Sequence, residues 1–402
     1  MFASTAPFRQ AFLAHFPERP FSIRFWDGTS IPSTTGSGPT FDIRSPRAFA
    51  YALSAPGQLG LGRAYVAGEI VPDEMDATLD VVATWKPPAI DRKAQAQLAF
   101  AAARASGLQK PPPVPAAELK PAGRRHSIMR DQRAVRHHYD VSNEFFAHFL
   151  DESMTYSCAV WDRGATTLEE AQFEKLDMVC RKLDLKPGDY VLDVGSGWGS
   201  FARHAAREYG ARVLGITLSP PQAELARQRT AEAGLSDKIE FQVRDYRDLP
   251  AEEFDAVSSI GMVEHVGSRN IDAYLANLHA ILKPGGRLLN HGIARVRHGD
   301  PEAGPFSERY VFPDGAPLHL SRVILAMERA RYVIDHVEGL HGQYEKTLQA
   351  WVDNLESDIP RAIELAGEER VRVWRLYLRA ARNGFATRFL STFQVRAHKP
   401  VE

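Results

Sequence analysis

Asp189-Tyr-Val-Leu-Asp-Val-Gly-Ser-Gly-Trp-Gly-Ser200 is an apolar run that stops at a glycine-rich turn, and residues 201–207 after it have a helical pattern. A strand, a glycine turn and a helix in this order present backbone N–H groups and a helix N-terminus to a ligand. Gly195, Gly197 and Gly199 allow a positive φ or a close backbone approach that a side chain would block. Many α/β units open with such a turn, so its meaning depends on the neighbouring segments.

The composition of the chain narrows the functional classes. Its 402 residues suffice for two or three domains. A net charge of −1 argues against a nucleic-acid binder. Two cysteines, Cys158 and Cys180, do not make a disulfide framework, so a reducing cytosol is the expected compartment. No apolar run approaches the roughly 18 residues that cross a bilayer, so any membrane contact is expected to be peripheral.

Strand-like and helical patterns alternate after the glycine turn. Further strands are predicted at 211–218, 238–243, 254–260 and 287–293. This alternation predicts a doubly wound parallel sheet, which binds its ligands beyond the carboxyl ends of the strands. The glycine turn, Thr217, Asp245 and residues 260–264 are all expected at that edge.

The flanking segments predict three parts of the chain. Residues 1–108 mix a hairpin at 21–28, a short strand at 40–44 and short helices, typical of a small accessory domain. Residues 109–124 form a Pro-rich and basic linker, and residues 125–402 form the catalytic domain. The basic side chains in and after this linker are either solvated or attracted to anionic headgroups, at about 1 kcal/mol each. They are Lys120, Arg124, Arg125, Arg130, Arg133 and Arg136.

Two acidic residues decide between the candidate nucleotides. A dinucleotide site expects an acid after the second strand, where this chain has Thr217. Its acids are instead Asp193, inside the first strand, and Asp245, which follows the third strand and can meet an adenine amino group. Together with the glycine turn, this arrangement resembles the S-adenosylmethionine-binding fold more than an NAD-binding one. Adjacent His137 and His138 cannot both face one ion from a helix, and no Cys/His spacing completes a site, so no metal is predicted.

Several separated motifs, in order, resemble the cyclopropane-fatty-acyl-phospholipid synthase family, which includes mycolic acid cyclopropane synthases and 10-methylene fatty acid methyltransferases. The motifs are Tyr156-Ser-Cys, Asp193-Val-Gly-Ser-Gly-Trp-Gly, Gly215-Ile-Thr-Leu-Ser-Pro-Pro-Gln, Asp245-Tyr-Arg-Asp-Leu, Met262-Val-Glu-His-Val-Gly, Arg309-Tyr-Val-Phe-Pro-Asp-Gly and Gly339-Leu-His-Gly-Gln-Tyr-Glu-Lys-Thr-Leu. The resemblance covers about 125–398. Ser196 replaces a usual cysteine in the turn, and Ala381 stands where some members have a cysteine, so no thiol role is assigned there.

The resemblance implies a class I S-adenosylmethionine methyltransferase fold (Rossmann-like, with a mostly parallel sheet) and a small α+β N-terminal domain. It implies transfer of a methyl(ene) group to the cis double bond of an unsaturated phospholipid acyl chain. The resulting carbocation loses a proton to bound bicarbonate, giving a cyclopropane. The bicarbonate ligands carried over are Cys158, Glu264, His291, Ile293 and Tyr344. The backbone N–H groups of the first and fourth, the imidazole and the phenol can donate to an anion, and the carboxylate can accept its proton.

The predicted cofactor contacts lie on the same motifs. They are Tyr156, Ser157, Asp193, Gly195, Gly197, Gly199, Thr217, Leu218, Gln222, Asp245, Tyr246 and Ile260. The helical face at 145–149, together with Tyr310 and Phe312, lines an acyl channel or forms plain core; both interpretations remain open at this point.

Other outcomes share the same residues. A hydride shift in the cation would give a 10-methylene chain, which a partner flavin reductase would convert to 10-methyl. More distant alternatives are a small-molecule methyltransferase and a non-catalytic lipid-binding subunit. The resemblance further implies a cytoplasmic protein at the inner face of the membrane, where it meets unsaturated phospholipid. The N-terminal domain would help to place it there or build a homodimer. No nucleic-acid partner is expected.

Overall fold

The computed structural model describes residues 4–107, 110–120, 123, 127, 129–130, 133, 142–249, 253–299, 304–315 and 317–401. The chain divides into two compact units. The first comprises Met1–Lys120, Gly304–Tyr310 and Gly367–Ala380, and the second comprises the remaining residues. Two short segments of the predicted catalytic part thus belong to the first unit. Arg124, Arg125, Arg136, His137 and His138, which carried predictions, lie outside the described residues.

The first unit contains a four-stranded sheet in the order β2-β1-β3-β4. The predicted hairpin is confirmed, because β1 and β2 pair antiparallel, and the short strand predicted at 40–44 is β3. Aromatic rings fill the core, with Phe8 4.6 Å from Phe49 between ring centroids. The elements of its N-terminal stretch are α1 Ala6–His15, β1 Ser22–Phe25, β2 Ser30–Ile31, β3 Thr40–Ile43, α2 Arg47–Ser54, α3 Gln58–Val66, β4 Ile70–Pro72, α4 Met75–Thr84 and α5 Arg92–Ala105.

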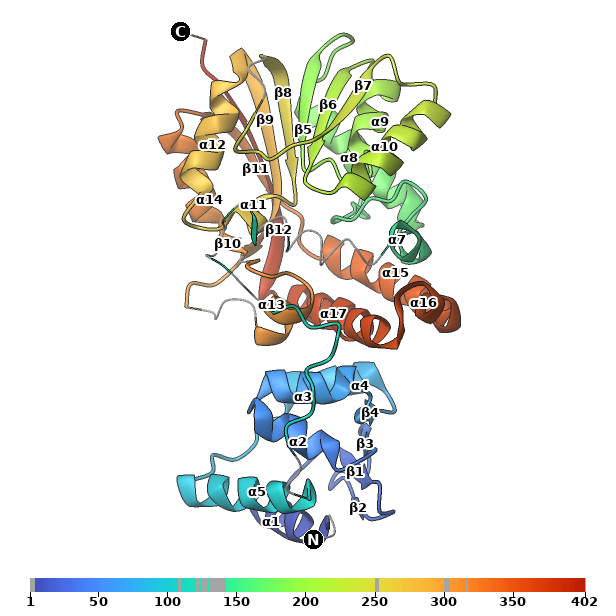
Figure 1. Cartoon of the computed structure of the whole chain (residues 1–402). Helices are drawn as coiled ribbons and strands as arrows, with labels where there is room; N and C mark the ends of the chain where they lie inside the picture. Colours follow the sequence, from blue (N-terminus) through green and yellow to red (C-terminus); the bar gives the residue numbers. More distant parts are fainter. Residues whose placement is uncertain are drawn as a thin grey trace. The chain divides into compact units, whose positions relative to one another are not determined.

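The second unit is organised around an eight-stranded sheet with the order β11-β12-β9-β8-β5-β6-β7, and β10 pairs with β9 (Figure 1). The five strands predicted from the sequence are β5 to β9, which run parallel as expected. Their bounds and those of the other strands are β5 Tyr190–Val194, β6 Arg212–Thr217, β7 Ile239–Val243, β8 Phe254–Ile260, β9 Leu282–Arg295, β10 Leu318–His319, β11 Val333–Gly339 and β12 Leu390–His398.

Helices cover both faces of this sheet, as a doubly wound fold requires (Figure 1). Apolar side chains of α8, α9 and α10 form the core on one face, and those of α12 and α14 form the core on the other. The helices are α7 Asn143–Phe149, α8 Leu168–Lys182, α9 Ser200–Glu208, α10 Pro220–Glu232, α11 Val263–Val266, α12 Ile271–Ala280, α14 Leu320–Arg329, α15 Gln343–Ser357 and α16 Ile359–Ala366. α13 Pro305–Tyr310 falls in the first unit, and α17 Glu368–Ala386 is shared by both.

The antiparallel strands β11 and β12 extend the sheet beyond β9. The register of β12 against β9 sets Gln394 beside His291 and Thr392 beside Ile293. Because side chains alternate along strands, these four side chains point to the same face of the sheet. The C-terminal strand therefore supplies neighbours to two of the predicted anion ligands.

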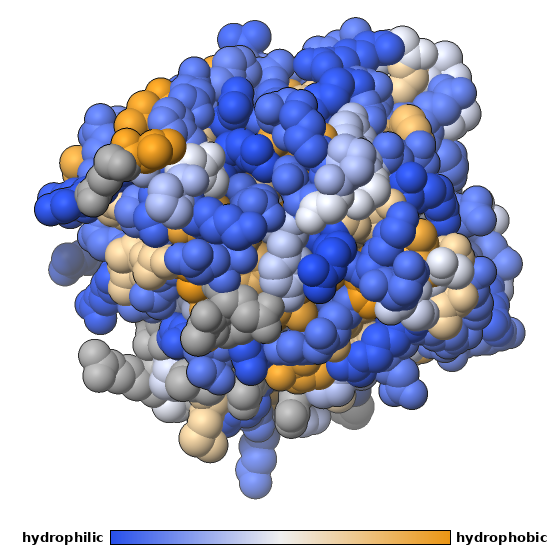
Figure 2. Space-filling view, turned by 90° about the horizontal axis from the view of Figure 1, so that it is seen from above, coloured by the Kyte–Doolittle hydropathy of each residue, from blue (hydrophilic) through white to orange (hydrophobic). Residues whose placement is uncertain are grey.

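The described part of the chain includes no helix that is both long and apolar enough to cross a membrane. The face shown in Figure 2 is mainly hydrophilic, with small and separated hydrophobic areas.

Candidate active site

The glycine turn after β5 has the backbone conformation that its sequence requires. Gly195, Gly197 and Gly199 have φ values of 76°, 53° and 79°, which confirms the predicted need for glycine. The N–H groups of Gly195 and Ser196 both donate to the Ile216 carbonyl, at 3.0 and 2.9 Å, and so tie the turn to β6. A Cβ at Gly195 would stand 2.5 Å from the Met262 sulfur, whereas one at Gly197 would enter open space. The turn is tightly held on one side and open on the other.

Asp193 lies at the end of β5 and is almost fully buried. Burial raises the pKa of its carboxyl to about 7, although the Lys175 ammonium and the Ser258 hydroxyl oppose this rise. A carboxyl whose pKa lies near neutral pH, at the sheet edge where ligands bind, is typical of a functional site.

The ends of β6 and β7 place the other predicted cofactor residues. The Thr217 hydroxyl donates to the Gln222 side-chain oxygen at 2.9 Å, and Leu218 between them is half-buried. The Asp245 carboxylate accepts from the side chain of Arg247 at 2.7 and 2.8 Å and from its backbone N–H at 2.9 Å. An adenine amino group would have to share this carboxylate with the guanidinium.

The segment carrying Tyr156, Ser157 and Cys158 is fastened to α8 by two buried side chains that the sequence did not single out. Gln172 donates to the carbonyls of Thr155 and Ser157, at 3.1 and 2.9 Å. Lys175, only 1% exposed, donates to the Ser157 hydroxyl at 2.9 Å. Burial lowers the pKa of Lys175 to about 8, while neighbouring acids, Asp151 foremost, oppose this.

Their spacing of three residues on one helix face was a sequence signal of a shared role. However, polar residues at this spacing are also common on solvated helix faces.

Cys158 is fully buried, and burial raises the pKa of its thiol to about 12. The side chain is therefore a neutral thiol, and its use as a nucleophile is disfavoured. Within the described residues its backbone N–H donates no hydrogen bond. The next N–H, of Ala159, donates to the Thr347 hydroxyl on α15 at 3.1 Å.

Tyr344 also lies on α15, one turn before Thr347. The Gln343 side chain accepts from the Trp161 N–H at 2.7 Å, which fixes the start of this helix against the segment after Cys158. The half-buried Tyr344 ring packs on Phe385, with 4.6 Å between ring centroids.

Glu264, on the short helix α11 after β8, is 8% exposed. Its Oε1 accepts from the backbone N–H of Ile293 at 2.6 Å. Its Oε2 is buried and has no hydrogen-bond partner among the residues that the structure describes. Burial raises the pKa of this carboxyl to about 7, although the Ile293 N–H opposes the rise. The Ile293 N–H, which was predicted to donate to the anion, thus bonds to Glu264 in this structure.

His291 lies two residues before Ile293 on β9, beside Ile260 at the end of β8. Burial, with help from the charges of Lys175 and Lys182, lowers the pKa of its imidazole to about 3, so the ring is neutral at physiological pH. Its Nδ1 lies 3.1 Å from the side-chain nitrogen of Gln394. The hydrogen bond from Ile293 brings the Glu264 carboxylate to β9, two residues from His291. Thr392, opposite Ile293 on β12, lowers the pKa of the Cys158 thiol against the larger effect of burial.

The aromatic residues considered for an acyl channel are closely packed. Phe145, Phe146 and Phe149 of α7 are fully buried, and the Phe146 ring lies 5.0 Å from the Trp198 ring of the glycine turn and 5.5 Å from that of Tyr156. The edge-to-face and tilted packing of these rings supports a role as core behind the cofactor edge.

The two other channel candidates lie elsewhere. Tyr310 belongs to the first unit, where its hydroxyl donates to Glu118 at 3.0 Å. Phe312 packs near His265, with 5.6 Å between the rings. Tyr246, a predicted cofactor contact, packs at 5.0 Å on Tyr274.

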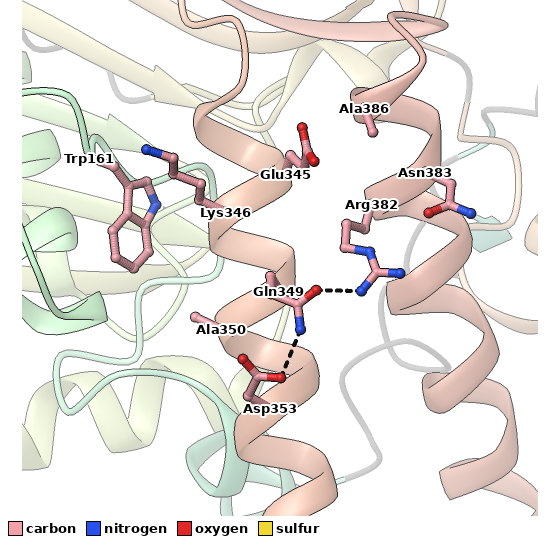
Figure 3. Close-up of a pocket in the computed structure, with 9 residues that line it drawn as sticks. All are labelled: Trp161, Glu345, Lys346, Gln349, Ala350, Asp353, Arg382, Asn383 and Ala386. Carbon is pink, nitrogen blue, oxygen red and sulfur yellow. Dashed lines mark hydrogen bonds between the residues drawn. The ribbon is translucent and has the colours of Figure 1, made fainter. Parts of the chain in front are cut away.

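A pocket of about 560 Å³ lies between α15 and the end of α17 (Figure 3). The side chains of Gln349 and Arg382 point toward one another across it, and the Gln349 amide also donates to Asp353 at 2.7 Å. Trp161 stands at its edge. None of the predicted cofactor or anion residues lines this pocket, so it is separate from the site described above.

Known proteins are similar in sequence to this chain over most of its length. A family model described as mycolic acid cyclopropane synthetase matches residues 126–395. A probable fatty acid methyltransferase of Pseudomonas putida is 38% identical over 387 residues, covering 95% of this chain and 92% of that protein. The cyclopropane-fatty-acyl-phospholipid synthase of Escherichia coli (strain K12) is 34% identical over 369 residues, covering 91% and 90%.

A solved structure gives the same result. Mycolic acid cyclopropane synthase CmaA1, complexed with SAH and CTAB, is 31% identical, with a TM-score of 0.63 over 67% of this chain and 98% of that one. The predicted class I fold and the predicted family are confirmed. The chain belongs to the mycolic acid cyclopropane synthetase family of S-adenosylmethionine-dependent methyltransferases.

Proposed function

We propose that this methyltransferase converts the cis double bond of an unsaturated phospholipid acyl chain to a cyclopropane, through a carbocation that is deprotonated by bound bicarbonate. When bound, S-adenosylmethionine supplies the methyl group and bicarbonate supplies the base. The observation that carries the proposal is Glu264, whose buried carboxylate has one oxygen bonded to Ile293 and the other unpartnered within the described residues. A buried acceptor without a partner is costly, and the proton of a bicarbonate ion would satisfy it.

The groups near Glu264 can donate hydrogen bonds to a bound anion, while Glu264 accepts the proton of that anion. His291 is neutral and can offer one ring N–H. The Cys158 N–H makes no hydrogen bond within the described part of the chain, and Tyr344 brings a hydroxyl on α15. Several hydrogen-bond donors around one acceptor match bicarbonate, which has both a negative charge and one proton. A dianion has no proton to donate to the acceptor, and a neutral ligand lacks the charge. The buried setting excludes water, which would otherwise capture a carbocation.

For the cofactor, we propose that the open side of the glycine turn and the Thr217–Gln222 pair bind the methionine and ribose end. Tyr156, Ser157 and Leu218 complete that end. On the adenine side we place Asp245, Tyr246 and Ile260. Asp193, on β5, supports the glycine turn that follows this strand. The register of β5, β6 and β8 supports this assignment, because it brings the carboxyl ends of the three strands to one edge.

A second outcome is favoured by one finding. The Pseudomonas putida relative, at 38% identity, is called a fatty acid methyltransferase rather than a cyclopropane synthase. If the cation shifts a hydride before it loses a proton, the same residues yield a 10-methylene chain, and a flavin reductase partner would then complete a 10-methyl product.

The test uses purified protein, S-adenosylmethionine and vesicles of a phospholipid with oleoyl chains, first in buffer freed of carbon dioxide and then with added bicarbonate. The two candidate products have equal mass, so the released fatty acids are examined by proton NMR and by ozonolysis. Ring protons and resistance to ozone support the cyclopropane, and vinylidene protons with ozone cleavage refute it. Turnover that does not respond to bicarbonate refutes the base.

We further propose that the protein acts at the inner face of the membrane, since its substrate resides there. Under this proposal, the protein should float with phospholipid vesicles in a density gradient. Protein that sediments without the vesicles overturns the proposal. Methylation of soluble amines or phenols, with none on vesicles, would instead support a small-molecule methyltransferase. Cofactor binding without any turnover would support a lipid-binding subunit.

A further inference from the structure

Three buried or half-buried polar side chains form a line that ends at His291. Lys182, at the end of α8, donates to the side-chain oxygen of Gln394 on β12 at 2.5 Å. The Gln394 side-chain nitrogen lies 3.1 Å from Nδ1 of His291 on β9. Gln394 is fully buried and His291 is 2% exposed, so water does not replace these contacts. Neither Lys182 nor Gln394 is among the predicted site residues.

The first step concerns the orientation of the amide. An ammonium group can only donate hydrogen bonds, so the Gln394 atom that contacts Lys182 has to be the carbonyl oxygen. Turning the amide round would place its NH₂ group against the ammonium. Lys182 is itself held by an ion pair with Glu338 on β11. The lysine therefore fixes which end of Gln394 faces the histidine.

The second step concerns the proton on the imidazole. The NH₂ end of Gln394 can only donate, so Nδ1 of His291 has to accept and carries no proton. The ring is neutral, because burial lowers its pKa to about 3. Its single ring proton consequently resides on Nε2. Among the described residues, Nε2 has no hydrogen-bond partner.

We propose that Lys182 and Gln394 are positioning residues, which hold His291 in the tautomer protonated on Nε2 so that it donates a hydrogen bond to the bound base. The proposal rests on the proposed function in one respect, namely that an anion binds at His291. With the opposite tautomer, Nε2 would turn a lone pair toward the anion, and a donor would become a repulsive contact. The wrong tautomer would weaken the anion without changing the shape of the site.

The first measurement reads the tautomer itself. Protein with ¹⁵N-labelled histidine is studied by NMR as wild type, as Lys182→Arg and as Gln394→Leu, with His291→Gln used only to assign the signal. We expect a protonated Nε2 and a bare Nδ1 in the wild type and in Lys182→Arg, which retains a charged donor. We expect Gln394→Leu to shift the signal toward a mixture of tautomers. A proton on Nδ1 in the wild type, or an unchanged spectrum in Gln394→Leu, overturns the proposal.

The second measurement is kinetic and uses Lys182→Met, which is near the surface and is less prone to misfold than a change at the buried Gln394. Loss of the group that orients a metal-ligating histidine typically costs about 10- to 100-fold, and the orienting role proposed here is of the same kind. We expect a loss of that size in kcat and in the response to bicarbonate, with the KM for S-adenosylmethionine nearly unchanged. Lys182→Arg should restore most of it. The matched control is Lys186→Met, which removes an exposed lysine paired with Asp184 and should have no effect.

The double variant separates positioning from simple structural support. If Lys182 acts only through Gln394, adding Lys182→Met to Gln394→Leu causes no further loss, whereas independent structural contributions multiply. Multiplying losses, or a rise in the cofactor KM, overturn the proposal. If the turnover of the wild type does not respond to bicarbonate but NMR shows the expected tautomer, the bicarbonate base is refuted and the role of Lys182 and Gln394 in setting the tautomer is not. The two failures are therefore distinguishable.

Discussion

Replacing Glu264 by Gln should make the protein more stable and much less active. The carboxyl pKa is raised from 4.5 to about 7 by burial, a shift that corresponds to roughly 3 kcal/mol of strain on the ionised form. The sign follows from linkage: between these two pH values the unfolded chain loses the proton while the folded chain keeps it, so stability falls as pH rises. Gln is neutral at every pH and escapes this cost.

The stability difference should therefore depend on pH in a defined way. It should be near zero at about pH 4.5, grow up to about pH 7 and stay constant above, reaching roughly 3 kcal/mol in favour of the variant. The replacement keeps an oxygen for the Ile293 N–H but converts the unpartnered oxygen into an NH₂ donor. The protonated carboxyl likewise carries an O–H donor on that oxygen, so the two neutral side chains are nearly matched at low pH.

Turnover should fall because the bound base loses its acceptor. A hydrogen bond with a charged group contributes about 1.5–3 kcal/mol, which is roughly 10- to 150-fold in rate. The assays are urea unfolding at several pH values, calorimetric binding of S-adenosylmethionine, and methyl transfer to vesicles. The reasoning is refuted if the variant unfolds more easily at pH 8 than at pH 5 relative to wild type, or if its turnover is unchanged.

Four other perturbations of this site have defined outcomes. In the wild type, kcat should rise as pH passes about 7, where Glu264 ionises, and a flat profile would contradict this. Cys158→Ala should retain most activity, and the native thiol should resist alkylation at pH 8 because its pKa is about 12; rapid labelling would show otherwise. Lys175→Met should raise the KM for S-adenosylmethionine roughly tenfold with a smaller change in kcat, since it removes a hydrogen bond under the cofactor edge; equal losses in both would disprove this reading. Gly195→Ala should weaken cofactor binding more than Gly197→Ala, because its Cβ would stand 2.5 Å from the Met262 sulfur and displace that side chain, in addition to the backbone strain of about 1–2 kcal/mol that both changes carry; equal calorimetric losses would refute the distinction.

The parallel sheet could be predicted because its signals are local. Each apolar run from Tyr190 to Ile293 ends at a glycine, a polar turn or an acid, and helical patterns separate the runs. The glycine turn was equally predictable, since all three of its glycines adopt φ values that disfavour other residues. Local patterns also placed Glu264 at the sheet edge, because it follows shortly after β8, but its role at the anion was implied only by the family resemblance.

The supporting residues could not be predicted in the same way. In the sequence, Lys175 looks like an ordinary lysine on the exposed face of an amphipathic helix. It is buried only because the segment at 155–158 packs against α8. Gln394 meets His291 through a strand pairing that joins residues 103 positions apart, for which the sequence has no local signal. A tertiary contact also decided that the N–H of Ile293 bonds to Glu264, 29 positions away in the sequence.

The first unit is discontinuous in the chain, and this affects how truncations should be read. A protein made without residues 1–120 would still carry Gly304–Tyr310 and Gly367–Ala380. Its Tyr310 would lose the Glu118 carboxylate, and its Glu369 would lose the Ala117 N–H. If such a truncated protein is inactive, the cause can be the loss of partners for these polar and aromatic groups. Inactivity alone therefore does not show that the first unit has a role in the reaction. A deletion at the N-terminus thus removes only part of the unit and leaves two internal segments that would need new partners.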